Sequence, residues 1–187
     1  ADISHLPYGE KSPGEIKKYR RYALDFFRKH ECHNLLIACN TAAVNFPLET
    51  RLQFPEFNIL DVVEPFRQNV LNLNNKDSVT ILCTDATKES GYYQKNLSDH
   101  YTNIEVVTPP ELVRLIERFP NNSPEIRKYL NDQVRSRISA ESQIIMLACT
   151  HFPIVRNQIK DILNSGVLLL DAIEVSRLHV TEEFGLQ

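Results

Sequence analysis

The sequence lacks any long apolar run. None of its hydrophobic stretches approaches the roughly 20 residues that a helix needs to cross a bilayer, and its start shows no signal-like pattern. We therefore predict no membrane partner. The 187 residues suffice for one large domain or two small ones, and either could bury a real core.

Cysteine is scarce and lacks the spacing of a structural site. The four cysteines, Cys32, Cys39, Cys83 and Cys149, are too few in a chain of this length for a disulfide framework. No CxxC pair indicates zinc, so we expect no metal. We interpret the four as free thiols in a reducing cytosol, which predicts a cytoplasmic protein.

A strong charge of one sign is also lacking. The chain has 21 Lys and Arg against 24 Asp and Glu, and its net charge of −3 is too small to suggest nucleic acid or an anionic membrane as a partner. No GxGxxG or Walker sequence occurs, so a dinucleotide or P-loop phosphate site has no support.

Short apolar runs alternate with helical patterns along the chain. Such alternation predicts parallel sheets in a doubly wound α/β architecture. The predicted strands cover residues 35–39, 58–63, 79–83, 104–107, 144–149 and 167–170. The predicted helices cover residues 13–30, 40–54, 65–73, 88–100, 110–118, 123–138, 154–163 and 172–184.

The polar stretch NNKDS, at residues 74–78, is the best domain boundary. We predict a first α/β domain over residues 1–74 and a second over residues 75–171. The C-terminal helix of residues 172–187 is a candidate to return to the first domain. In open α/β sheets, ligands gather at the carboxyl ends of the strands, which is where Cys39, Cys83 and Cys149 fall.

Two of the predicted strands end in the same way. LLIACNTAAV, residues 35–44, and IIMLACTHFPIV, residues 144–155, both pass from an apolar run through Ala-Cys to a polar pair. A cysteine just before a helix lies near unpaired N–H groups and the positive end of the helix dipole, and both lower the pKa of the thiol. One copy could be simple packing, but two copies indicate a duplicated half-site with one cysteine on each side of a cleft.

Two thiols that face a single carbon suit inversion by proton transfer. One thiolate removes a proton from one face while the opposing thiol donates a proton to the other face, with no metal or pyridoxal cofactor. His151 would assist Cys149 as a hydrogen-bond partner or proton relay. Asn40, Thr41 and Thr150 would supply donors to a bound carboxylate and to the developing enolate oxygen.

Five short motifs follow one another along the chain. They are PYG (7–9), ACNTA (38–42), VVEP (62–65), CTDATKESGYY (83–93) and LACTHFP (147–153). Together they resemble glutamate racemase, of the aspartate/glutamate racemase superfamily. The resemblance implies two doubly wound α/β domains related by a pseudo-two-fold axis, with glutamate bound between them. It also implies cofactor-free interconversion of L- and D-glutamate, which supplies D-glutamate for peptidoglycan, and homodimers are common in the family.

The resemblance also assigns roles by position. The implied catalytic residues are Cys39 and Cys149 as proton donors and acceptors, with His151 beside the second. The implied substrate-binding residues are Tyr8, Gly9, Asn40, Thr41 and Thr150, to which we add the hydroxyls of Thr84 and Thr87. Glutamate racemases have His after the second Cys-Thr, where aspartate racemases tend to have Glu, so His151 favours glutamate.

Two other residues near these motifs are less clear. Cys83 ends a strand, but the matching family position usually holds a small residue, which favours packing over chemistry. Glu117 aligns with a glutamate near the second half-site, or is simply a charge on a helix surface.

The sequence departs from the family pattern at its start. Glutamate racemases begin with a strand that ends in Asp-Ser-Gly, and the aspartate of that turn assists the first cysteine; nothing here corresponds to it, nor to the usual closing strand. We expect an excerpt of a longer protein, because a variant without a central strand would leave strand edges uncovered. Pro47 further predicts that the regular helix after Cys39 starts near Phe46 or kinks there.

Three rival functions remain open from the sequence. An aspartate racemase would use the same thiols. Cys149 with His151 as a base could perform hydrolysis or acyl transfer, although this leaves Cys39 unexplained. A racemase-like glutamate-binding or regulatory protein without turnover would fit the absence of an Asp-Ser-Gly strand.

Overall fold

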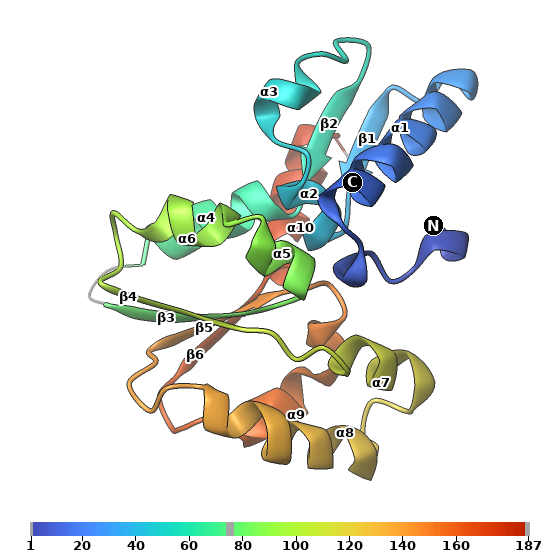
Figure 1. The fold of residues 1–187 in the computed structure, drawn as a ribbon. Coiled ribbons are helices and arrows are strands. Elements are labelled where there is room, and N and C mark those ends of the chain that lie inside the picture. The colour runs from blue at the N-terminus through green and yellow to red at the C-terminus, as the bar shows by residue number, and fades with distance from the viewer. Residues whose placement is uncertain (1, 74–76, 186–187) are drawn as a thin grey trace.

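The computed structural model describes residues 2–73 and 77–185, and these contain two parallel sheets (Figure 1). The smaller sheet pairs β1 (Asn34–Ile37) with β2 (Asn58–Asp61). The larger sheet has the order β4-β3-β5-β6, formed by β3 (Ser78–Cys83), β4 (Asn103–Val107), β5 (Ile144–Ala148) and β6 (Leu168–Asp171). The predicted α/β class with parallel sheets is confirmed, whereas the pseudo-two-fold relation stays a prediction.

The helices connect these parallel strands. They are α1 (Pro13–Lys29), α2 (Asn40–Val44), α3 (Leu48–Arg51), α4 (Val63–Leu71), α5 (Asp85–Glu89), α6 (Tyr92–Leu97), α7 (Leu112–Arg118), α8 (Pro124–Tyr129), α9 (Arg156–Asp161) and α10 (Ala172–Glu183). Two short 3-10 turns matter for the site, η2 (Tyr8–Glu10) and η5 (Phe152–Val155). Within the described ranges, no helix combines the length and the apolar character needed to cross a membrane.

Helix α1 begins as its sequence predicts. Ser12 caps the helix by accepting a hydrogen bond from the Glu15 N–H, while the Glu15 carboxylate accepts from the Ser12 N–H, and Pro13 occupies the first turn. The buried face of α1 packs Leu24 against Leu35 of β1, in a small core that also contains Phe46. This small core holds α1 against the two-stranded sheet.

The larger sheet is covered on both faces because its strands are apolar on both sides. Ile144, Met146 and Ala148 face one core and Ile145 and Leu147 face the other, as strand alternation requires. Helices α4, α5 and α6 lie on one side of the sheet, and α7, α8 and α9 lie on the other (Figure 1). The sheet thus places its carboxyl edge between two rigid helical layers.

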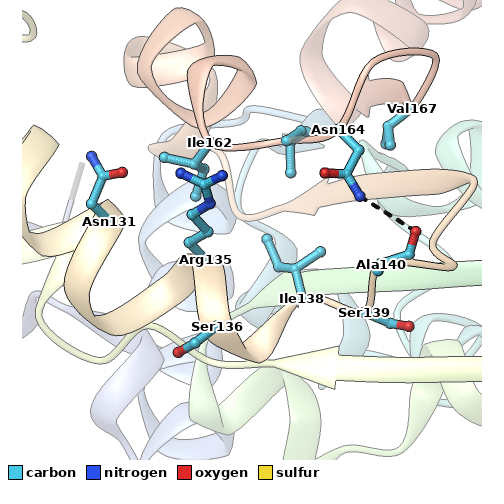
Figure 2. Close-up of a pocket in the computed structure, with 10 residues that line it drawn as sticks. Asn131, Arg135, Ser136, Ile138, Ser139, Ala140, Ile162, Asn164 and Val167 are labelled. Carbon is cyan, nitrogen blue, oxygen red and sulfur yellow. Dashed lines mark hydrogen bonds between the residues drawn. The ribbon is translucent and has the colours of Figure 1, made fainter.

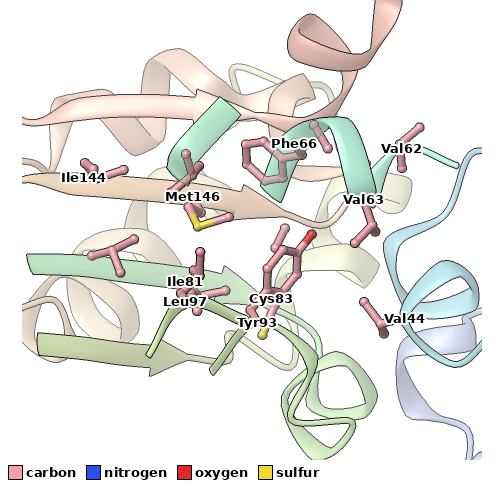
Figure 3. Close-up of a cluster of buried hydrophobic side chains, with 14 of the residues drawn as sticks. Val44, Val62, Val63, Phe66, Ile81, Cys83, Tyr93, Leu97, Ile144 and Met146 are labelled. Carbon is pink, nitrogen blue, oxygen red and sulfur yellow. The ribbon is translucent and has the colours of Figure 1, made fainter. Parts of the chain in front are cut away.

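The first core joins the two halves of the chain. Figure 3 shows Phe66 of α4 beside Tyr93 of α6 over β3 and β5, with the two ring centroids 6.4 Å apart. Helix α10 packs against α4, and the Ser176 hydroxyl donates to the Val62 carbonyl at 2.9 Å. The predicted boundary between residues 74 and 75 lies outside the described residues, so the division into domains stays a prediction.

Three predicted helices are interrupted in the structure. Helix α2 starts at Asn40 and ends at Val44, and Pro47 caps α3. Of the two alternatives, the start near Phe46 was wrong, and the helical segment is instead interrupted at Pro47. Gly91, at φ 64°, separates α5 from α6 within the predicted 88–100 helix. The predicted 123–138 helix changes after α8 to a π turn at Leu130–Val134 and a 3-10 turn at Arg135–Arg137.

The shared core predicts a large cost for truncating Phe66. Its side chain is fully buried, so we expect Phe66→Ala to destabilise the protein by about 3–5 kcal/mol. Phe26→Ala is the matched control, because Phe26 is 57% exposed, and it should cost about 0.5 kcal/mol or less. Urea unfolding measures both changes. Equal midpoints for the two variants would contradict the proposed packing of α4 on the larger sheet.

Candidate active site

A cavity of about 340 Å³ lies at the carboxyl ends of β1, β3 and β5. Cys39 follows β1, Thr84 follows β3 and Cys149 follows β5, and all three line this cavity. The predicted site residues that also line it are Tyr8, Gly9, Asn40, Thr41, Thr150 and His151. We call this space the two-thiol cavity. Of the predicted site residues, Thr87 is the one that does not line it.

Cys39 occupies the junction between β1 and α2. It is the N-cap residue of α2, with extended backbone angles of φ −131° and ψ 119°, and its carbonyl accepts the first helical hydrogen bond from Ala43 at 2.9 Å. The backbone N–H groups of Thr41 and Ala42 act to lower the pKa of its thiol, although the sulfur makes no capping hydrogen bond to the helix. These donors are the unpaired N–H groups that every helix start exposes.

Cys149 occupies the matching junction after β5. It is buried, and its carbonyl accepts a hydrogen bond from the Phe152 N–H at 3.1 Å, at the start of η5. The N–H groups of His151 and Phe152 act to lower the pKa of its thiol. At each cysteine, two backbone N–H groups from the turn that follows its strand act to lower the pKa of the thiol.

The expected lowering of the thiol pKa values was wrong in its net direction. Burial, and to a smaller extent the nearby Cys39, raise the pKa of Cys149 to about 12 against the opposing effect of the two backbone donors. Burial likewise raises the pKa of Cys39, again against the backbone donors. The sequence reveals the donors but not the depth of burial, which outweighs them. Both sulfurs are therefore neutral thiols at neutral pH.

His151 joins Cys149 to a carboxylate. Its Nδ1 lies 4.0 Å from the Cys149 sulfur, and its Nε2 lies 3.0 Å from Oε1 of Glu117 in α7. A carboxylate on the far nitrogen fixes the orientation of the imidazole. The contact answers the open question about Glu117, which is a partner of the site histidine and not only a surface charge.

Hydroxyl and amide groups from two helices meet behind the thiols. Thr41 of α2 is hydrogen-bonded to Thr84 at 2.9 Å and to Thr87 at 3.2 Å, so Thr87 contributes through these partners. Asn40 donates through Nδ2 to the buried Tyr93 hydroxyl at 2.7 Å. Among the described residues, the buried Asn40 Oδ1 has no partner, which leaves one acceptor of the cluster unused.

The η2 turn closes one side of the cavity. Tyr8 donates its hydroxyl proton to Asp2 Oδ2 at 2.7 Å, and burial followed by this bond raises the pKa of Tyr8. Asp2 also lines the cavity, and no feature of the sequence pointed to it. Gly9 approaches Thr84 so closely that a Cβ atom there would lie 2.6 Å from Thr84 Cγ2. Glycine is required here by close contact.

A second cavity, of about 350 Å³, lies near the amino ends of β5 and β6 (Figure 2). Arg135 is the one charged residue among the described residues that line it, and Asn164 donates to the Ala140 carbonyl at its edge. It has no pair of groups for acid–base chemistry. Across residues 2–73 and 77–185, no group of three or more His, Cys, Asp or Glu side chains is placed to hold a metal ion.

Comparisons with known proteins agree on one family. The model of the Asp/Glu/Hydantoin racemase family matches residues 1–176. A glutamate racemase of Clostridium perfringens strain SM101 is 32% identical over 173 residues, which cover 91% of this chain and 66% of that protein. The chain thus spans just under two thirds of the length of that relative.

Solved structures are similar over nearly the whole chain. Glutamate racemase from Campylobacter jejuni subsp. jejuni superposes with a TM-score of 0.86 at 26% identity, covering 98% of this chain and 73% of that one. Glutamate racemase from Francisella tularensis in complex with D-glutamate gives a TM-score of 0.83 at 25% identity, covering 99% and 70%. The structural comparison and the sequence comparison therefore indicate the same family.

The close contact at Gly9 predicts a steric effect of a single methyl group. Gly9→Ala should destabilise the protein by about 1–3 kcal/mol, because the new Cβ overlaps Thr84. Gly14→Ala is the matched control, since nothing lies within 4 Å of its added Cβ, and it should be neutral or stabilising by up to about 1 kcal/mol. Thermal unfolding of both variants checks this; an unchanged midpoint for Gly9→Ala would mean that η2 does not pack on Thr84.

The raised thiol pKa predicts how alkylation depends on pH. Iodoacetamide reacts with the thiolate, so the rate at Cys149 should keep rising about tenfold per pH unit between about pH 7 and about pH 10 in the folded protein. In the urea-unfolded chain, where a thiol pKa is about 8.5, the rate should level off within that range. Mass spectrometry of the Cys149 peptide gives both rates. A plateau near pH 9 in the folded protein would show that burial does not hold this sulfur neutral.

Proposed function

The chain belongs to the Asp/Glu/Hydantoin racemase family, and from this premise we propose that it interconverts L- and D-glutamate by proton transfer between two thiols. One observation carries the proposal. Cys39 and Cys149 come from matching strand-to-helix junctions and line the same cavity. Two acid–base groups on opposite sides of one carbon are what inversion without a cofactor requires.

The reaction breaks and forms one C–H bond at Cα. The thiolate of one cysteine takes the Cα proton, and the electron pair moves into the substrate carboxylate to give an enediolate. The thiol of the other cysteine then donates its proton to the opposite face, which restores the carboxylate and leaves the second sulfur as the thiolate. The mirror-image reaction uses the same two groups in exchanged roles.

Both thiols are neutral at rest, so one must become a thiolate before the reaction. The positive charge of the substrate ammonium group would favour that change. An amino acid brings an ammonium group, and a positive charge near a sulfur favours its thiolate. The N–H groups of Thr41 and Ala42 at Cys39, and of His151 and Phe152 at Cys149, already act to lower the pKa of each thiol. Burial protects the unloaded site from unwanted thiolate chemistry. When the substrate ammonium lowers the pKa of one thiol, the proton of that thiol leaves to the His151 imidazole from Cys149, or to solvent from Cys39.

The polar cluster would hold the substrate carboxylate and ammonium groups. Thr41, Thr84 and Thr150 supply hydroxyls at the cavity wall, and Asn40 supplies an amide whose orientation is fixed by Tyr93. Thr87 would act indirectly, by orienting the hydroxyls of Thr41 and Thr84. Tyr8 and Gly9 would close the site from the η2 turn.

His151 and Glu117 would support the proton transfer that Cys149 makes at its side of the substrate. The imidazole receives or returns the proton of Cys149, and Glu117 holds the ring in position through its contact with Nε2. No equivalent pair touches Cys39 among the described residues. The two half-reactions would therefore depend on different supporting groups.

The wider biological context is proposed on the resemblance to glutamate racemases. We propose a cytoplasmic enzyme that supplies D-glutamate for peptidoglycan and that acts as a homodimer. Glutamate is favoured over aspartate because His151 follows Cys149 and Thr150, and because the relatives described above are glutamate racemases. The two-domain division at residues 74 and 75 belongs to the same proposal.

Deuterium incorporation tests the activity and the cysteine pair together. The protein translated from its complete reading frame is incubated with each glutamate enantiomer in heavy water, and we expect inversion with one deuterium gained at Cα. Cys39→Ser and Cys149→Ser should each slow inversion by at least about 100-fold, because a hydroxyl is a far weaker acid and base at neutral pH. Cys32→Ser is the control, since Cys32 is exposed and lies outside the cavity. Absence of Cα exchange in the wild type, or inversion that survives either cavity substitution, would defeat the proposal.

The Cys149, His151 and Glu117 contacts also support a second candidate, a cysteine hydrolase or acyl transferase. Sulfur, imidazole and carboxylate stand in the order that such enzymes use. This function leaves Cys39 without a role. A covalent acyl adduct on Cys149, trapped with an activated ester and located by mass spectrometry, would favour it over racemisation.

A further inference from the structure

Glu10 and Arg114 form a bidentate ion pair between distant parts of the chain. The Arg114 guanidinium donates through Nε to Glu10 Oε1 at 2.9 Å and through Nη2 to Glu10 Oε2 at 2.7 Å. Two parallel bonds of this kind fix both distance and orientation, which a single lysine contact would not do. We call this pair the Glu10–Arg114 clasp.

The clasp joins the two sides of the two-thiol cavity. Glu10 ends the η2 turn directly after Gly9, and Arg114 lies in α7 directly after Val113; Gly9 and Val113 both line the cavity. Helix α7 also carries Glu117, the partner of His151. The pair therefore connects the turn that carries Tyr8 and Gly9 to the helix that supports Cys149.

The clasp is weak enough to let the η2 turn open and close. Its side chains are 58% and 39% exposed, so water and salt compete with the pair, and an exposed ion pair stabilises its closed state only weakly. The other anchors of the turn include the close contact of Gly9 with Thr84, the Tyr8 hydrogen bond to Asp2 and the packing of the Tyr8 ring near Tyr19 of α1. Among the described residues, only the clasp joins the turn to α7 through an ion pair.

We propose that Glu10 and Arg114 are positioning residues that hold the η2 turn closed over the two-thiol cavity and thereby control entry to it. Neither residue lines the cavity, so they act through Tyr8, Gly9 and Val113. The consequence for turnover rests on the proposed glutamate racemase function, whereas the control of access does not. Loss of the clasp should weaken substrate binding and leave the proton transfers unchanged.

Charge reversal provides the test. Glu10→Arg and Arg114→Glu each place like charges together, and the double variant restores an opposite pair in reversed order. Each single variant should raise KM for glutamate about two- to fivefold with kcat little changed, and the double variant should recover most of the loss. Arg127→Glu is the matched control, because it breaks the exposed Arg127–Asp161 pair between α8 and α9, away from the cavity.

Thiol labelling measures access to the two-thiol cavity, and it does so whether or not the protein turns over substrate. Iodoacetamide labelling at Cys39 and Cys149, measured by mass spectrometry relative to the exposed Cys32, should rise about two- to fivefold in each single variant. It should return towards the wild-type ratio in the double variant and remain unchanged in Arg127→Glu. Added salt should raise the ratio in the wild type but not in the single variants.

The outcomes separate the two proposals. Labelling that follows this pattern in a protein without turnover supports the clasp and removes the racemase function. Turnover in the wild type with labelling and KM unaffected by the single variants overturns the clasp. A double variant that labels as fast as the single ones, with an unchanged unfolding midpoint, also overturns it, because the restored pair would then not close the turn.

Discussion

The proposed inversion requires two sulfurs that face one small cavity, and Cys39 and Cys149 line the same cavity. Parallel strands bring their carboxyl ends to a common edge, so Cys39 after β1 and Cys149 after β5 can both reach the space between the sheets. The shared core of α4, α6, β3 and β5 holds the halves of the chain together beneath that space. Relative movement of the two sheets would change the distance between the sulfurs first.

Burial and backbone donors act on the thiols in opposite directions. The N–H groups at each helix or turn start favour a thiolate, whereas the apolar surroundings raise the pKa, and burial outweighs the donors at both cysteines. Under the proposed function, such a site would be unreactive when empty, and an incoming ammonium group would reverse the balance. The same burial that keeps the thiols neutral would strengthen every charge interaction with the proposed substrate.

Much of this arrangement could be predicted because it is local in sequence. The two Ala-Cys junctions, the Ser12 capping box and the alternation of strands and helices each depend on neighbouring residues. The features that the sequence did not predict depend on contacts between residues far apart in the chain, or on how deeply a side chain is buried. Glu117 meets His151 across 34 positions, Asp2 reaches the cavity through its bond to Tyr8, and the pKa direction at Cys149 depends on burial that no short segment encodes. The break at Gly91 depends on a positive φ angle that the helical pattern around it concealed.

Chemical cross-linking tests the facing of the two sulfurs most directly. A Cys32→Ser variant, treated with a short bifunctional alkylating reagent such as dibromobimane and digested, should yield one intramolecular cross-link that joins the peptides of Cys39 and Cys149. Saturating glutamate should suppress it by filling the space between the thiols. Single adducts on both cysteines without any cross-link between them would show that the sulfurs do not share a cavity, and the two-thiol chemistry would fail with it.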